Sequence, residues 1–285
     1  MSKKQKIISF VIFAAVIILL LIGSILVGGA SEEESISVVM KNEVLHETHK
    51  VNFFGMQVNP GLISAFTVSG IIIIFAVIVR IFVIPKFKLI PGKFQLFLEE
   101  IVSMFDRLAK SNSPHKNSFL GAYIFGAGVY IFVGTVFELF GFQVISSRGA
   151  SLAMPAPLSD INGAIAMGFL SYGIILVAGI MANGIKGAGK TLKDFSLPIS
   201  MSFRLFGALL SGALVTELVY YYVGLRYVVP VLVGVLFTLL HALIQAYVLT
   251  LLTSIFYGEA VEKSEKKPKK KKKIVVSEEI KNENI

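Results

Sequence analysis

The sequence has 285 residues, of which 55% are hydrophobic and only 16% are charged, with a net charge of +9. It contains no cysteine, which excludes a disulfide framework and a thiolate metal site. Its apolar residues are gathered in runs of about 20, the length that a helix needs to cross a bilayer. The composition therefore excludes soluble domains on a single anchor. It predicts an all-α polytopic membrane protein without a cofactor or a metal.

Six apolar runs are long enough to span a membrane: residues 7–26, 63–84, 119–142, 161–185, 199–225 and 228–257. We therefore predict about six transmembrane helices. The first run follows a basic start and precedes small residues, so it also fits a cleaved signal peptide. Its length favours a retained helix. The chain then divides into an N-terminal helix or signal anchor (1–30), an external loop (31–62), a membrane core (63–260) and a tail (261–285).

Lysine and arginine are concentrated in alternate connections. They precede the first run, follow the second and fourth, and crowd the tail, whereas residues 31–60 are net acidic. Cytoplasmic loops are enriched in these residues, so we predict a multi-pass protein of the cell membrane with both termini in the cytoplasm. The lysine-rich tail is predicted to be disordered and to attract anionic lipids. No aromatic or folded element accompanies its lysines, so nucleic acid is not a predicted partner.

Residues 91–112, "PGKFQLFLEEIVSMFDRLAKSN", place apolar side chains on one side of a helix and charged side chains on much of the other. This pattern predicts a surface helix that lies in the cytoplasmic interface or docks on a partner. An amphipathic helix that only anchors a loop fits equally well.

The segment from Gly184 to Thr191, "GIKGAGKT", matches the phosphate-loop pattern G-x-x-x-x-G-K-[ST]. That chemistry needs a strand before the loop and a helix after it. Here a membrane run precedes the segment, and Pro198 interrupts any soluble helix that follows. We interpret it as a basic cytoplasmic turn.

Arg204 lies within the fifth apolar run, where a charged side chain costs between about 2.5 and 17 kcal/mol. Its guanidinium cannot lose its proton, so it stays a fixed positive charge. Small residues (Gly207, Ala208, Ser211 and Gly212) follow at helical spacing and would let another helix approach closely. The pattern suits a surface past which an anionic partner moves. A snorkelling or structurally paired arginine is the alternative.

Further polar residues accompany the arginine. Glu217 lies thirteen positions after it, about 140° round the helix and ~20 Å further along, so the two cannot pair directly. His241 and Gln245 share a face of the last run. Glu138 ends the third run, and Asp160 and Asn162 open the fourth. Together these residues are typical of a proton or ion path.

At these residues the sequence resembles subunit a of F-type ATP synthase, the ion-channel component of its membrane sector, Fo. "SFRLFGALLSG" around Arg204 is similar to the arginine motif of that family, and "ALIQAYVLTLLTSIFYGEA" to its last-helix motif. "PGKFQ" and "APLSDINGAIAMGF" occur in the expected order. The resemblance covers roughly residues 63–260.

The resemblance implies two offset half-channels that carry protons, or Na⁺, to and from a rotating ring of c subunits, each with an essential carboxylate. It implies that Arg204 faces that carboxylate and that Gln245 is the polar last-helix position near it. Glu259, with Glu138, Asp160 and Asn162, would line the outer mouth or the inner exit. The implied partners are the c-ring and a peripheral stalk of b subunits. The subunit itself would not be an enzyme.

The sequence departs from the family pattern at three positions. Ala208 replaces the usual asparagine, Ala213 an ionisable residue, and Thr238 the last-helix partner of that residue, seven positions before Gln245. Glu217 and His241 lie one turn or less beyond two of these positions, and we expect them to carry the outer relay through bridging water.

Two other classes of protein fit the sequence less well. A secondary transporter with its own Arg/Glu/His site would show internal repeats, and none is visible. An intramembrane enzyme would need a nucleophile–base or metal constellation, which four scattered histidines without cysteine do not provide.

Overall fold

The computed structural model describes residues 11, 12, 15, 18, 22, 51–53, 56–115, 117–145, 151–221 and 229–262. Most of the first predicted span, most of the external loop and the lysine-rich tail lie outside them. Five helical segments within the described residues are long and apolar enough to cross a membrane. They correspond to the second to sixth predicted runs, and the predicted all-α fold is confirmed.

The first of these segments changes its helix type near its end. Helix α3 (Pro60–Ile78) begins where the side chain of Asn59 accepts a hydrogen bond from the Gly61 amide. It continues as a π-helical turn (Val79–Val83) and a 3₁₀ turn (Ile84–Lys86). Pro85 has no N–H to donate to the preceding turn, which explains why regular α-helix stops before it.

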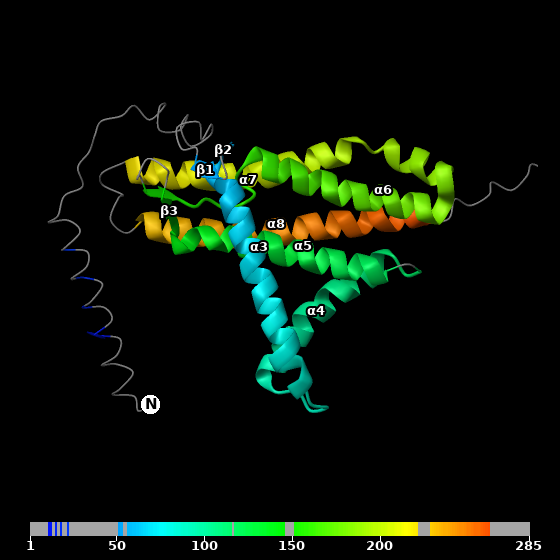
Figure 1. Cartoon of the computed structure of the whole chain (residues 1–285), viewed down its shortest axis with the longest axis horizontal. Helices are drawn as coiled ribbons and strands as arrows, with labels where there is room; N and C mark the ends of the chain where they lie inside the picture. The colour runs from blue at the N-terminus through cyan, green and yellow to red at the C-terminus, as the bar shows by residue number, and fades with distance from the viewer. Residues whose placement is uncertain are drawn as a thin grey trace, which may run out of the picture.

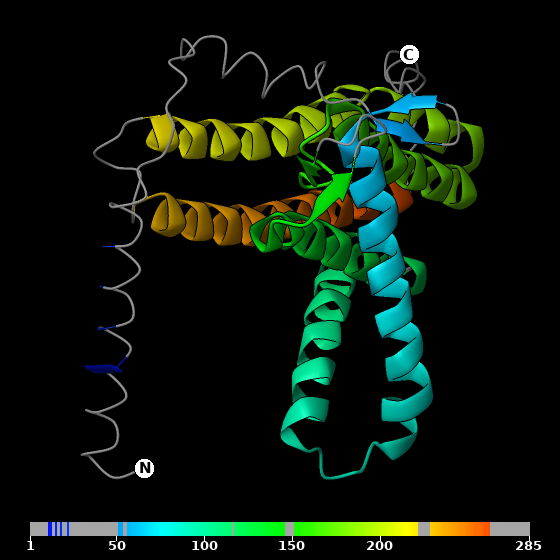
Figure 2. The same ribbon diagram turned by 60° about the vertical axis from the view of Figure 1, so that its left-hand side comes forward.

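Helix α4 (Lys93–Asn112) is the predicted amphipathic helix. Figure 2 shows α3 and α4 extending away from the other helices, joined at their far ends by the turn that follows Lys86. Phe105 and Ala109 of α4 are buried against α5 and α8, whereas Phe94 and Phe97 near its start are more than half exposed. The predicted apolar side is therefore buried only in the second half of the helix.

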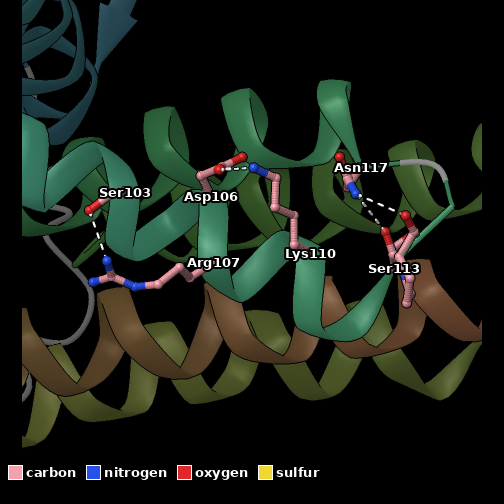
Figure 3. A network of polar contacts seen from close by, with 7 residues as sticks. Ser103, Asp106, Arg107, Lys110, Ser113 and Asn117 are labelled. Atoms are coloured by element: carbon pink, nitrogen blue, oxygen red, sulfur yellow. Dashed lines mark hydrogen bonds and ion pairs between the residues drawn. The ribbon is translucent and has the colours of Figure 1, made fainter.

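The charged side of α4 is held by local contacts (Figure 3). Arg107 pairs with Glu100 at 2.6 Å and donates to Ser103, and Lys110 pairs with Asp106 at 2.5 Å. These side chains are about half exposed or more. Exposed pairs of this kind contribute little to stability.

The remaining helices form a bundle. Helices α5 (Ser118–Phe137), α6 (Ile161–Leu192), α7 (Ser196–Tyr221) and α8 (Val229–Val261) run roughly alongside one another, and α3 crosses them steeply (Figure 1). The main core lies between them and includes Ile131, Met167, Leu205 and Leu249. Because of the steep crossing, the five spans cannot all stand upright in a bilayer.

The fourth predicted run ends at residue 185, beside a break in α6 at Gly184, whose φ is 62° and ψ −148°. A second helical arm then continues α6 to Leu192, where a turn was expected. The basic segment is therefore largely helical and folds back, so that Gly187 meets the carbonyl oxygen of Gly179. Helix α7 begins at Ser196, three residues before the fifth predicted run. It includes Pro198 in its first turn, where a proline is tolerated.

Two short hairpins, not predicted, lie in the connections. Strand β1 (Val51–Phe53) pairs antiparallel with β2 (Met56–Val58) just before α3. Strand β3 (Gln143–Ile145) pairs with β4 (Ser151–Ala153) between α5 and α6. Each strand has only three residues, too short for an apolar alternation to be recognised in the sequence.

Candidate functional site

Arg204 lies on a face of α7 that no described helix covers. Met201, Leu205 and Leu209, on the adjacent side of the helix about 60–140° round from Arg204, are buried in the bundle core. Arg204 itself is exposed and makes no ion pair to any acidic side chain that the structure describes. A fixed charge is thus presented outward from the bundle.

The free face around Arg204 combines bulky and small residues. Phe203 is 64% exposed, and Gly207 and Ser211 on the following turns are also exposed. A side chain added at Gly207 would meet nothing within 4 Å. Gly212 differs, because a Cβ there would lie 3.4 Å from Nδ1 of His241 on α8. Of these small residues, Gly207 and Ser211 therefore lie on the free face, and Gly212 lies on the face that packs against α8.

His241 borders a polar cavity formed by three helices. Thr135 and Glu138 line it from the end of α5, Gly212 and Thr216 from α7, and Thr238 from α8. The cavity has a volume of about 20 Å³, which is room for roughly one water molecule. The structure thus brings together Glu138 and His241, two of the residues proposed from the sequence, and we call this space the His241 cavity.

Glu217 follows Thr216 in α7, but its side chain lies outside the described part of the structure. Gly212 faces His241, and Glu217 is five residues, or about 7.5 Å, further along the helix axis.

Gln245 is buried, with 5% of its surface exposed, between Ala242 and Ala246 on the inner side of α8. Helices α7 and α8 run antiparallel (Figure 2). Counted from the Gly212–His241 contact, Gln245 lies about 6 Å short of the level of Arg204. Gln245 is buried within the bundle, whereas Arg204 is exposed on its outside. No hydrogen bond joins the two side chains in the described structure.

Asp160 and Asn162 do not line the His241 cavity. Asp160 caps α6, where its Oδ1 accepts from the Asn162 amide at 3.2 Å. Its Cβ also lies 3.2 Å from the Cβ position of Gly61 at the start of α3. Asp160 and Asn162 therefore stabilise the start of α6 where it meets the start of α3.

Glu259 lies near the other end of α8, about 27 Å along the helix from His241. Together with Lys190 and Thr191 at the end of α6 and Asp194 in the α6–α7 connection, it borders a second cavity of about 10 Å³. The ionisable residues named from the sequence thus fall into separate groups along α8, with Arg204 at an intermediate level.

Sequence reasoning missed Thr135 and Thr216. Thr135 is three positions before Glu138, a spacing that places both on one helix face, and this could have been noticed. Thr216 gives no such sign, because its place beside His241 depends on the register of α7 against α8.

Fold and site together define a multi-pass membrane protein that holds ionisable groups along its last two helices. The ATP synthase A chain family model matches residues 63–258, more than half of the chain, so the chain belongs to that family. It is accordingly an ion-channel subunit of the Fo membrane sector.

Proposed function

We propose that this chain is the stationary subunit that passes ions, H⁺ or Na⁺, to and from the carboxylates of a c-ring, and so couples ion flow to rotation without being an enzyme. The observation that carries this proposal is the position of Arg204, exposed on a helix face that the bundle leaves free. Family membership makes a ring the expected neighbour of that face.

The role of Arg204 follows from its permanent charge. As a ring carboxylate arrives, pairing with the guanidinium favours the ionised carboxylate and hence release of its bound ion. The same charge repels a cation that would pass directly from one side to the other. Transient pairing with an anion in a dry site also offsets the cost of holding a charge within the membrane region.

The His241 cavity is the proposed outer half-channel. His241 and Glu138 border it and can each take and return a proton, and one water can bridge them. Glu217 would continue the route outward, and Gln245 would continue it toward Arg204. Asp160 and Asn162 are assigned to the outer mouth from their place at the start of the fourth apolar run.

The cavity bordered by Glu259 and Asp194 is the proposed inner exit. It is separated from the His241 cavity along α8, as two offset half-channels would be. An ion that enters by one cavity would then have to be carried by the ring before it leaves by the other.

The placement of the chain in the membrane and its remaining partners are proposed from the charge pattern and from the family. The chain would lie in the cell membrane with both termini in the cytoplasm, a membrane core at 63–260 and the tail at 261–285 near anionic lipids. Peripheral-stalk b subunits would hold it against the torque of the ring.

Arg204→Ala in vesicles that contain the whole synthase tests the proposal. ATP-driven ion uptake should be lost, and passive ion flow should rise. Arg80→Ala is the matched control, because Arg80 is an exposed arginine in the π-helical turn after α3 and lies outside the site. Retained uptake in Arg204→Ala would refute the role of the arginine.

A secondary transporter is the alternative function. The purified chain would then transport ions alone, whereas the proposed subunit should be inactive alone and co-purify with a ring and a soluble ATPase.

A further inference from the structure

The C-terminal end of α8 is capped by side chains from a distant part of the chain. The last carbonyl groups of a helix have no partner within it and need other donors. Asn183 of α6 donates from Nδ2 to the carbonyl oxygen of Ala260 at 3.0 Å and to that of Glu262 at 3.1 Å. Lys190 donates from Nζ to the carbonyl oxygen of Glu259 at 2.7 Å.

Both donors belong to the segment where α6 breaks and folds back. Asn183 directly precedes Gly184, whose positive φ turns the chain, and Lys190 lies on the returning arm. The returning arm is fastened in turn, because Tyr172 donates to the carbonyl oxygen of Thr191 at 3.2 Å. The phosphate-loop-like motif is therefore part of an ordered fold-back, in which Lys190 of the motif and Asn183 just before it donate to α8.

The opposite side of the same end of α8 rests on α4. Ser254 donates to the carbonyl oxygen of Leu108 at 3.1 Å, and Gly258 lies directly against the carbonyl oxygen of Asn112. The end of α8 is thus held from two sides, while along much of its length α8 exposes large apolar side chains such as Leu240, Leu243 and Tyr247.

We propose that Asn183 and Lys190 are positioning residues for ion coupling, which clamp the end of α8 and thereby fix its register against α7. This inference rests on the proposed function. A ring that turns against the free faces of α7 and α8 would load α8 sideways and along its axis. The Asn183–Lys190 clamp opposes that load, and so keeps His241 against Gly212 and Gln245 at its level relative to Arg204.

The first test compares variants in vesicles that contain the whole synthase. Asn183→Leu and Lys190→Met remove the donors but keep similar side-chain volumes. The number of ions pumped per ATP hydrolysed should fall about two- to tenfold, the factor that corresponds to one ordinary hydrogen bond. Lys190→Arg keeps a charged donor and should retain most of the coupling.

Lys186→Met is the matched control, because Lys186 is an exposed lysine on the same returning arm and makes no hydrogen bond to a described residue. It removes the same charge and should leave the ratio unchanged. An unchanged ratio in Asn183→Leu, or an equal loss in Lys186→Met and Lys190→Met, would overturn the proposal. A parallel loss of pumping and membrane-bound ATPase at constant ratio would show a role in assembly alone and would also overturn it.

The second test restores the clamp covalently. The chain has no cysteine, and the Cβ position of Gly179 on α6 lies 3.4 Å from the Cβ of Ala260 on α8, close to the separation found in disulfides. The hydroxyl of Thr191, 2.8 Å from the same position, must rotate away to admit the new side chain. In an Asn183→Leu background, Gly179→Cys with Ala260→Cys should regain coupling on mild oxidation and lose it on reduction. Failure to form the cross-link, or a cross-link that leaves coupling low, would overturn the proposal.

The outcomes separate this inference from the proposed function. If Arg204→Ala retains pumping, the function fails whatever the clamp does. If Arg204→Ala abolishes pumping but the Asn183 and Lys190 variants keep the normal ratio, only the clamp fails.

Discussion

A Cβ atom at Gly212 of α7 would lie 3.4 Å from Nδ1 of His241 on α8, so the imidazole packs against a residue that has no side chain. Gly212→Leu should push His241 aside and fill the neighbouring cavity. We expect ATP-driven ion uptake to fall at least about tenfold, because closure of a single-water path breaks a proton relay. Gly126→Leu on α5 is the control, since nothing lies within 4 Å of its Cβ position. Equal uptake by the two variants would contradict the proposed role of the cavity.

Glu138 and His241 border the same cavity and should act as one unit. Glu138→Gln and His241→Gln should each slow passive ion flow through the membrane sector. The double variant should be little worse than the worse single variant, because groups that share one path are not independent. Flow through vesicles stripped of the soluble ATPase measures all three. Simple multiplication of the two single effects would mean that the residues act separately.

Gly184 adopts a backbone conformation that is close to a glycine-only region. Gly184→Ala should destabilise the fold by about 1–3 kcal/mol. Gly189→Ala on the same helical arm has no such conformation and open space at its Cβ position, so it should be neutral or slightly stabilising. Thermal unfolding midpoints of the detergent-purified complexes distinguish the two. A Gly184→Ala midpoint no lower than that of Gly189→Ala would refute the strain argument.

Phe105 fixes α4 to the bundle. It is 8% exposed and lies beneath Gly128 of α5, whereas Phe97 on the same helix is 60% exposed. Phe105→Ala should weaken the docking of α4 by about 3 kcal/mol through the cavity left behind, and Phe97→Ala should have little effect on the isolated subunit. Protease cleavage within α4 measures the release of the helix. Equal cleavage of both variants would show that Phe105 does not hold it.

Much of the fold could be predicted from the sequence, because the cost of burying unpaired backbone in lipid makes long apolar runs helical. The spans after residue 60 and the amphipathic helix α4 follow from run length and from the spacing of apolar residues. The break at Gly184 could not be predicted in the same way. Its stability depends on the contact of Gly187 with Gly179 and on donors that reach α8, all of which are tertiary features.

The candidate site was predictable as a set of residues but not as a geometry. Residue type alone singled out Arg204 and His241, since charged or titratable groups are costly in a membrane. The burial of Gln245 and the meeting of Glu138 with His241 depend on how far α8 slides and turns relative to α5 and α7. That register is set by packing between helices, and a single sequence does not reveal it.

The contact between Ser254 and Leu108 has a consequence for biosynthesis, because 146 positions separate the two residues. A ribosome adds about 5–20 residues per second, so the C-terminal turn of α4 must wait roughly 7–30 s for its support to be synthesised. During that interval the side chain of Phe105 has only part of its final surroundings. Chaperones or proteases that inspect nascent membrane proteins would therefore meet α4 packed only against the helices made before α8, and completion of the last helix is the event that covers its C-terminal turn.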